Sequence, residues 1–353
     1  MSLSPPTEVS VPREALEKFV RRVFVTAGVE ADAANVLADV LVAADMRGVH
    51  THGVSFLPQY VERILTGRVN PDGHPHVVKD DGAVIQVDAD NAMGHLAAVF
   101  GMRQAISRAR AFGVAAVAVR NSNHSGAMAY YPMLALSEDM IGLATTQALP
   151  TMAPWGGLDQ LLGNDPLAVA IPADTERPIV LDTPFQNSFP LKIELWRQRG
   201  WPIPADWAFD AAGKPTTDPA EALKGFGQPA GGYRGVGLAL VMSVFAALLT
   251  GSSWGRELTT IPGRANSGEV GHFFMAFNIA AFESVTRFKG RIDRIIREIH
   301  SSRRADGVER ILVPGEREAE CEEASRSLGI PLLESTINAL DQLAQRLGVE
   351  APR

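Results

Sequence analysis

The apolar residues near the start of the chain recur at steps of three and four residues. This pattern runs through residues 14–47 and is interrupted at Gly28. Such spacing places apolar side chains on one face of a helix, and glycine commonly ends a helix. We therefore predict two helices in this stretch, followed by a short helix at residues 60–65.

Shorter apolar runs in the middle of the chain predict strands. Residues 114–119 are β-branched and apolar, as in a buried strand, and residues 77–87 contain the turn Asp80-Asp81-Gly82 between two such runs. Further strands are expected at residues 141–145, 168–171, 179–181, 273–277 and 311–313. Helices are expected at residues 93–112, 130–138, 236–250 (buried), 288–300 and 335–347, and a Gly- and Pro-rich loop at residues 196–235.

The alternation of helices and strands in the middle of the chain predicts an α/β fold. With 353 residues, the chain is long enough for one large domain or two of roughly 150 residues. We expect residues 1–76 and 300–353 to form a helical domain, and residues 77–299 a central α/β domain with a loop-rich part at about 183–235. No GxGxxG pattern follows a predicted strand, so a Rossmann fingerprint is absent.

Composition narrows the classes of partner. The net charge of -7 disfavours a nucleic-acid partner, which would require a basic face. The single cysteine, Cys321, lies among glutamates, which disfavours a nucleophilic thiol and fits a reducing compartment. The first twelve residues lack the apolar segment of a signal peptide, and the longest apolar run, residues 236–250, is shorter than the ~20 residues of a membrane span. We therefore expect a cytoplasmic protein without a membrane partner.

Short motifs occur in a fixed order along nearly the whole chain. They are residues 47–54 (RGVHTHGV), 121–126 (NSNHSG), 150–157 (PTMAPWGG), 202–204 (PIP), 215–219 (PTTDP), 231–238 (GGYRGVGL), 271–274 (GHFF) and 314–316 (PGE). Together they resemble the malate/L-lactate dehydrogenase family that lacks a Rossmann fold. Its relatives include ureidoglycolate and sulfolactate dehydrogenases, diketogulonate reductases and piperideine-2-carboxylate reductases.

The resemblance implies a fold and a reaction class. The expected fold is the family's non-Rossmann nicotinamide-binding fold, with a central mixed sheet and helical regions at both termini. The expected enzyme is an oxidoreductase that uses NADH or NADPH on a small-molecule substrate, either a 2-oxo or 2-hydroxy acid or a cyclic imine. A homodimer with its active site close to the subunit contact is also expected.

The resemblance points to two histidines for the chemistry. Histidine suits proton transfer because its pKa lies near neutrality. His52 is expected to be the general acid and base, Thr51 to orient it, and His124 to polarise the substrate oxygen. For the other histidines we expect structural roles, including His272 in its motif. His50 and His52 are two residues apart, which is poor spacing for a metal, so no metal site is expected.

Binding residues follow from the same motifs. Gly-rich turns let backbone amides approach a pyrophosphate closely. The residues expected near the cofactor are Pro154, Trp155, Gly156, Gly157, Asp182, Lys192, Gly231, Gly232, Arg234 and Gly235. Those expected near the substrate are Arg47, Phe56, Asn123, Thr146 and Phe185.

Several positions depart from the family pattern. Phe56 stands where the family has an arginine that pairs with the substrate carboxylate. Asp165, Phe185 and Gln186 replace an amide and two small residues near the cofactor, and Gln147 replaces an asparagine. Asp165 would repel a pyrophosphate. These changes indicate either a reductase for a bulky or aromatic substrate or a protein that keeps His52 and His124 for non-redox acid/base chemistry without a cofactor. A non-catalytic scaffold is a third hypothesis, against which the two retained histidines argue.

Overall fold

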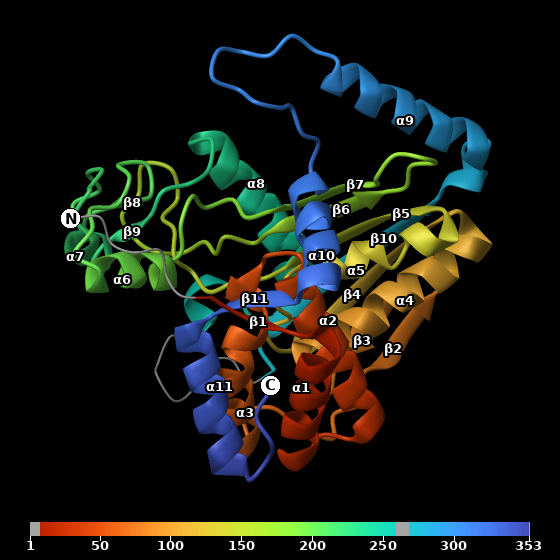
Figure 1. Cartoon of the computed structure of the whole chain (residues 1–353). Helices are drawn as coiled ribbons and strands as arrows, with labels where there is room; N and C mark the ends of the chain where they lie inside the picture. The colour runs from red at the N-terminus through yellow and green to blue at the C-terminus, as the bar shows by residue number, and fades with distance from the viewer. Residues whose placement is uncertain (1–7, 259–267, 353) are drawn as a thin grey trace.

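The computed structural model describes residues 8–258 and 268–352 (Figure 1). Within these residues the largest sheet has seven strands. They are β2 (His76–Asp81), β3 (Val84–Asp88), β4 (Val114–Ser122), β5 (Met140–Thr146), β6 (Leu167–Ile171), β7 (Ile179–Thr183) and β10 (Val270–Asn278). In the order β2-β3-β4-β10-β5-β6-β7, β3 and β4 run parallel, and the other neighbours are antiparallel. The prediction of an α/β fold with a central mixed sheet is confirmed.

Strand β10 lies at the centre of the sheet although it comes late in the chain. It pairs with β4 on one side and β5 on the other. His272 joins these strands, because its Nδ1 lies 2.7 Å from Thr146 Oγ1 and its Nε2 lies 2.8 Å from Ser122 Oγ. Burial lowers the pKa of His272 to about 3, so the ring stays neutral. This histidine therefore fixes the strand ends that precede His124 and carry Thr146.

Helices pack on the sheet and beside it. They are α1 (Arg13–Thr26), α2 (Ala31–Met46), α3 (Leu57–Leu65), α4 (Gly94–Phe112), α5 (Tyr130–Met133), α6 (Pro190–Gln198), α7 (Pro219–Ala222), α8 (Tyr233–Ser243), α9 (Val285–His300), α10 (Glu316–Leu328) and α11 (Glu334–Leu347). Helix α4 packs on β4 and β10, and its buried side chains share one apolar cluster with the sheet. Burial of this apolar surface is the main stabilising contribution to the central layer.

The two ends of the chain share a second hydrophobic core. Leu16 and Phe24 of α1 pack in the same buried cluster as Leu340 of α11. A two-stranded antiparallel sheet joins β1 (Glu8–Val11) to β11 (Ile330–Leu333). Figure 1 shows α1, α3 and α11 side by side below the central sheet. The boundaries of the expected helical domain stay a prediction. Of the first twelve residues, which were expected to contain no signal peptide, residues 1–7 lie outside the described residues.

Some predicted elements are wrong or incomplete. Residues 311–313 form no strand, and residues 130–138 form α5 and a separate 3-10 turn, Leu136–Glu138, instead of one helix. The predicted loop at residues 196–235 contains the end of α6, helix α7 and the short strands β8 (Ala208–Phe209) and β9 (Phe226–Gly227). The rings of Trp196 and Trp207 lie 4.9 Å apart there, beside a small apolar cluster. Contacts between tryptophans that are not regularly spaced in the sequence organise this segment. For this reason no hydrophobic periodicity predicts its structure.

The apolar run at residues 236–250 is helical as far as Leu248, and the expectation that it is buried holds for one face only, which includes Val236, Ala239, Met242 and Ala246. Helix α8 continues into a π-helical segment, Val244–Leu248. The apolar side chains that are between 41% and 58% exposed here are Leu238, Leu240, Val241, Val244, Leu248 and Leu249. A patch of this kind on a single chain marks an interaction surface. In the described ranges, no helix has the length and apolar character to cross a membrane.

Candidate active site

A cavity of about 1080 Å³ lies between the helical ends of the chain and the central sheet. Its walls come from the end of α2 and the turn after it, from α3, from the loop after β4, from the ends of β5 and β7, and from the start of α10. The expected site residues that line it are Arg47, Thr51, His52, Phe56, His124, Thr146 and Asp182. The cavity therefore brings together side chains from four segments that lie far apart in the sequence.

The turn that carries His52 is tied to the end of α2 by a buried carboxylate. Asp45 accepts a hydrogen bond from the Val54 amide at 2.7 Å, and its other oxygen lies 2.9 Å from His50 Nδ1. A Cβ atom on Gly53 would lie 2.1 Å from this carboxylate, so only glycine fits there. By binding Asp45, His50 thus helps to hold the turn that positions His52.

His52 itself has a hydroxyl neighbour and an apolar setting. Thr51 Oγ1 lies 3.0 Å from His52 Nδ1. Burial lowers the pKa of His52 below its ordinary value, because the charged ring loses hydration. At neutral pH the imidazole is therefore uncharged, and its other nitrogen is left for the cavity.

Three rings stack at this wall of the cavity. The centroids of His52 and His124 lie 5.9 Å apart with 21° between the planes, and Phe56 lies 6.0 Å from His52 and 5.4 Å from His124 at similarly small angles. Phe189 approaches His52 edge-on at 6.5 Å. The surroundings of His52 are therefore aromatic and apolar on two sides.

Sequence reasoning missed two residues of α3. Tyr60 and Arg63 both line the cavity. Tyr60 Oη lies 2.7 Å from His124 Nδ1, and Arg63 donates a hydrogen bond to Asn123 Oδ1 at 2.9 Å. Steps of four and three residues from Phe56 place all three on one face of a helix, and this spacing could have revealed them.

The far end of the cavity is formed by the start of α10. Gly315 has a φ of 94° and packs so closely on β7 that a Cβ atom would lie 2.8 Å from Val180. Arg317 and Glu318 follow it in the wall, and Arg47 donates to Glu322 at 3.0 Å. This part of the wall therefore carries charged side chains of both signs.

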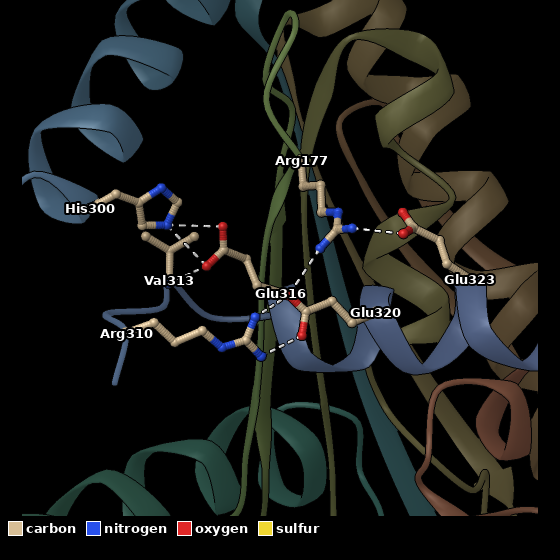
Figure 2. A network of polar contacts seen from close by, with 7 residues as sticks. All are labelled: Arg177, His300, Arg310, Val313, Glu316, Glu320 and Glu323. Atoms are coloured by element: carbon tan, nitrogen blue, oxygen red, sulfur yellow. Dashed lines mark hydrogen bonds and ion pairs between the residues drawn. The ribbon is translucent and has the colours of Figure 1, made fainter. Parts of the chain in front are cut away.

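Polar contacts fix α10 in this position (Figure 2). The Glu316 carboxylate accepts from the Val313 amide at 2.9 Å and lies 3.0 Å from His300 Nε2 of α9. Glu320, one turn along, pairs with Arg310 and with Arg177 of the turn between β6 and β7. The Val313 amide is thus used by a side chain rather than by a neighbouring strand, which explains the missing strand at residues 311–313.

Comparison with known proteins matches residues 11–341 to the family described as malate/L-lactate dehydrogenase. The chain belongs to this family. It is 35% identical over 351 residues to a malate dehydrogenase of Pyrococcus abyssi, which covers 97% of this chain and 96% of that relative. It is 36% identical over 353 residues to an L-sulfolactate dehydrogenase of Methanocaldococcus jannaschii, with 99% and 98% covered.

A solved structure agrees with the sequence comparison. The malate dehydrogenase from Pyrococcus horikoshii OT3 superimposes with a TM-score of 0.89 at 32% identity, covering 99% of both chains. The chain is an oxidoreductase of the malate/L-lactate dehydrogenase family, and its cofactor is a nicotinamide dinucleotide. These relatives support the redox hypothesis and not the alternative of non-redox acid/base chemistry.

The residues that the resemblance places near the cofactor fall into two groups. Asp182 lines the cavity, and it accepts a hydrogen bond from the Ala129 amide at 2.7 Å. Burial raises the pKa of Asp182 to about 6. Outside the described walls of the cavity lie Pro154, Trp155, Gly156, Gly157, Lys192, Gly231, Gly232, Arg234 and Gly235.

The two expected glycine turns nevertheless lie side by side. The rings of Trp155 and Tyr233 are 6.3 Å apart, and Gly232 lies under Trp155. Trp155 is 62% exposed, and the turns adjoin the apolar face of α8. Lys192 is held elsewhere, with its Nζ 4.2 Å from the centre of the Trp207 ring. A cofactor role for these residues stays a prediction.

Two expected substrate residues lie in the packing behind the cavity. Asn123 is buried, where it accepts from Arg63 and donates to the Ala92 carbonyl at 2.8 Å. Phe185 belongs to an apolar cluster with Met152 and Val236. Both support neighbouring segments, and their contact with substrate stays a prediction.

The expectation that Asp165 would repel a pyrophosphate stays a prediction. Its carboxylate is buried and accepts hydrogen bonds from the Ala148 amide at 2.6 Å and from the Ser243 hydroxyl. Gln186 is likewise used internally, accepting from Thr151 Oγ1 at 2.6 Å and donating to the Ser188 carbonyl. These departures from the family pattern are absorbed by local hydrogen bonds.

The cavity fits a nicotinamide dinucleotide in size and in the character of its walls. Its volume is in the range of cofactor sites. The flat rings around His52 suit contact with a planar nicotinamide ring, and Arg317 at the start of α10 suits an anionic group. In the described ranges, no three His, Cys, Asp or Glu side chains are arranged to hold a metal ion.

Proposed function

We propose that this chain transfers a hydride between a nicotinamide cofactor and a small 2-oxo acid, 2-hydroxy acid or cyclic imine, with His52 as the proton donor and acceptor. The observation that carries the proposal is the pair of imidazoles, His52 and His124, 5.9 Å apart at the wall of a cofactor-sized cavity. The single cysteine, Cys321, fits a cytoplasmic enzyme, and the cytoplasm is where we place the reaction.

The side chains divide the work of such a reaction. A bound nicotinamide ring supplies or takes up the hydride. His52 gives a proton to the substrate oxygen or nitrogen during reduction and takes it back during oxidation, while Thr51 holds the ring at Nδ1. His124 lies beside the same reacting group. The apolar rings of Phe56 and Phe189 exclude water from His52.

We further infer that Arg317 and Glu318 decide between NADH and NADPH. Both line the far end of the cavity. An arginine bound to the 2′-phosphate of NADPH gains a charge-assisted hydrogen bond, whereas a nearby carboxylate repels that phosphate. Of the residues that the resemblance assigns to the cofactor, Asp182 lines the same cavity. The others, which lie outside its described walls, remain part of the proposal as further cofactor contacts.

Titration of the purified protein with NADH and NADPH, followed by protein fluorescence, tests both inferences. We expect binding of at least one cofactor. Arg317→Ala is expected to weaken NADPH binding about 10-fold and to leave NADH within about 2-fold, since one charge-assisted bond is lost. Glu318→Gln is expected to strengthen NADPH binding.

Arg294→Ala, an exposed arginine of α9, is the matched control for the loss of charge. Equal weakening of both cofactors by Arg317→Ala would contradict its role at the phosphate. No binding of either cofactor to the folded protein would contradict the proposed function itself.

We also propose that the enzyme is a homodimer in which a second copy covers the apolar face of α8. Support comes from the exposed side chains of this face, with Leu248 at 58%, and from the exposed Trp155 beside it. Stable homodimer interfaces are apolar in this way. The glycine turns that adjoin this face would then lie at the subunit contact.

Light scattering is expected to give twice the mass of the chain. The double variant Val241→Glu, Leu248→Glu is expected to be a monomer, because each carboxylate would be buried without a partner. Phe282→Glu, at an exposed phenylalanine outside this face, is the control and is expected to remain a dimer. A dimeric double variant would show that the copies meet elsewhere.

A further inference from the structure

Tyr60 is a buried phenol whose hydroxyl forms a hydrogen bond with His124. It is 3% exposed, it belongs to α3, and its oxygen lies 2.7 Å from Nδ1 of His124. Burial raises the pKa of Tyr60 above its ordinary value, so the hydroxyl keeps its proton throughout the neutral range. Among the described residues, His124 is its hydrogen-bond partner.

His124 is an uncharged ring in the same setting. Its pKa is lowered well below the ordinary value, first by burial and then by the nearby His52 and His95. A neutral imidazole has a single N–H, which sits on either Nδ1 or Nε2. The hydrogen bond with Tyr60 therefore has two possible directions.

The need of each buried polar group for a hydrogen-bond partner selects one direction for the bond between Tyr60 and His124. If Nδ1 carried the proton, it would donate to Tyr60 and leave the phenol hydrogen without an acceptor among the described residues. An unsatisfied buried donor costs about 1–3 kcal/mol. If Tyr60 donates to Nδ1, both groups are satisfied and the proton of His124 sits on Nε2, the nitrogen that is left for the cavity.

We propose that Tyr60 is a positioning residue that fixes the Nε2–H tautomer of His124 and so makes this histidine a permanent hydrogen-bond donor to the substrate oxygen or nitrogen. The inference rests on the proposed function, since it assigns His124 a role in that reaction. A neutral donor aimed at the atom that gains negative charge stabilises the transition state. In this role His124 donates a hydrogen bond but transfers no proton.

The contrast with His52 supports this division of roles. The Nδ1 partner of His52 is the Thr51 hydroxyl, which can donate or accept and is exposed to solvent. His52 can therefore hold a proton on Nε2 or give it up, as an acid and base must. His124, locked by a phenol, keeps one state. The two histidines of the wall thus have different hydrogen-bond partners and, through them, different roles in the reaction.

Nitrogen-15 NMR of the ring nitrogens, in protein labelled at histidine, tests the inference without substrate. We expect His124 to show a protonated Nε2 and an unprotonated Nδ1, with the signals assigned by their loss in His124→Gln. In Tyr60→Phe we expect a mixture of tautomers and a fall in kcat of about 10-fold to 100-fold, the range for partners that orient a histidine. KM should change less than kcat.

Tyr131→Phe is the matched control, because it also removes a buried phenol hydroxyl, one that donates to the Ser125 carbonyl. It should leave the His124 tautomer unchanged. A proton on Nδ1 of His124 in the unaltered protein would overturn the inference, and so would a Tyr60→Phe variant with unchanged tautomer and kcat. If neither NADH nor NADPH supports turnover, the proposed function fails, while the spectrum of the unaltered protein still decides whether Tyr60 sets the tautomer.

Discussion

Replacement of His52 by glutamine is expected to lower kcat by between about 100-fold and about 10,000-fold, the usual contribution of a general acid and base. Glutamine retains an amide that can form hydrogen bonds but cannot exchange a proton at neutral pH. Cofactor binding should change little, because the ring contributes an apolar wall rather than a charge. Steady-state kinetics and the cofactor titration measure the two effects separately.

The pH dependence of the unaltered enzyme also tests the assignment of His52 as the general acid and base. Burial lowers the pKa of His52 below its ordinary value, so the protonated ring needed for reduction is lost as pH rises through that lowered pKa. Reduction should therefore be fastest at acid pH, whereas oxidation, which needs the neutral ring, should reach a plateau above the same pKa. His52→Gln should lose this dependence. His76→Gln, at an exposed histidine of β2, is the control and should retain it. A fully active His52→Gln would move the proton transfer to another group.

The sequence predicted the long, periodic elements because their apolar faces appear as a regular spacing within a short stretch of sequence. It failed where contacts come from far along the chain. Helix α10 lacks an apolar stripe, and ion pairs such as Glu320 with Arg310 hold it in place. Strands β1 and β11 are four residues each and stabilise one another from opposite ends of the chain. Neither signal is present in a local window.

The candidate site was predicted in part for the same reason. His52 and His124 stand in motifs, so resemblance found them, and the structure brings their rings together. Phe56 packs on His124, and Tyr60 forms a hydrogen bond with His124, far along the chain from both. Helical spacing shows that Phe56 and Tyr60 share a face, but it does not show which residue that face meets. For the apolar run of α8 the helix was predicted but the exposure of one face was not. A hydrophobic pattern does not show whether a neighbouring element or a second copy covers that face.

Phe56 offers the sharpest test of substrate choice. Its ring lies against both His52 and His124, where the malate/L-lactate dehydrogenase family usually has an arginine that pairs with the substrate carboxylate. An apolar ring at this place favours substrates with an apolar or aromatic group and gives no charge to a second anionic group. We therefore expect the enzyme to reduce phenylpyruvate with a higher kcat/KM than oxaloacetate, in contrast to the malate dehydrogenases that it resembles.

Phe56→Arg is expected to reverse this preference by about 10-fold to 100-fold in the ratio of the two kcat/KM values. A charge-assisted bond to a carboxylate contributes about 1.5–3 kcal/mol, and each 1.4 kcal/mol is a factor of ten. Phe56→Leu is the matched control, because it removes the ring without adding a charge, and it should keep the preference for the apolar substrate. If oxaloacetate is already the better substrate of the unaltered enzyme, and Phe56→Arg leaves the ratio unchanged, then the carboxylate is bound elsewhere and this ring does not set specificity. Because Phe56 stacks on both imidazoles, the pH profile of Phe56→Arg separates an effect on binding from an effect on His52. A positive charge introduced beside the His52 ring should lower the pKa of His52 further and shift the acid limb of reduction with it.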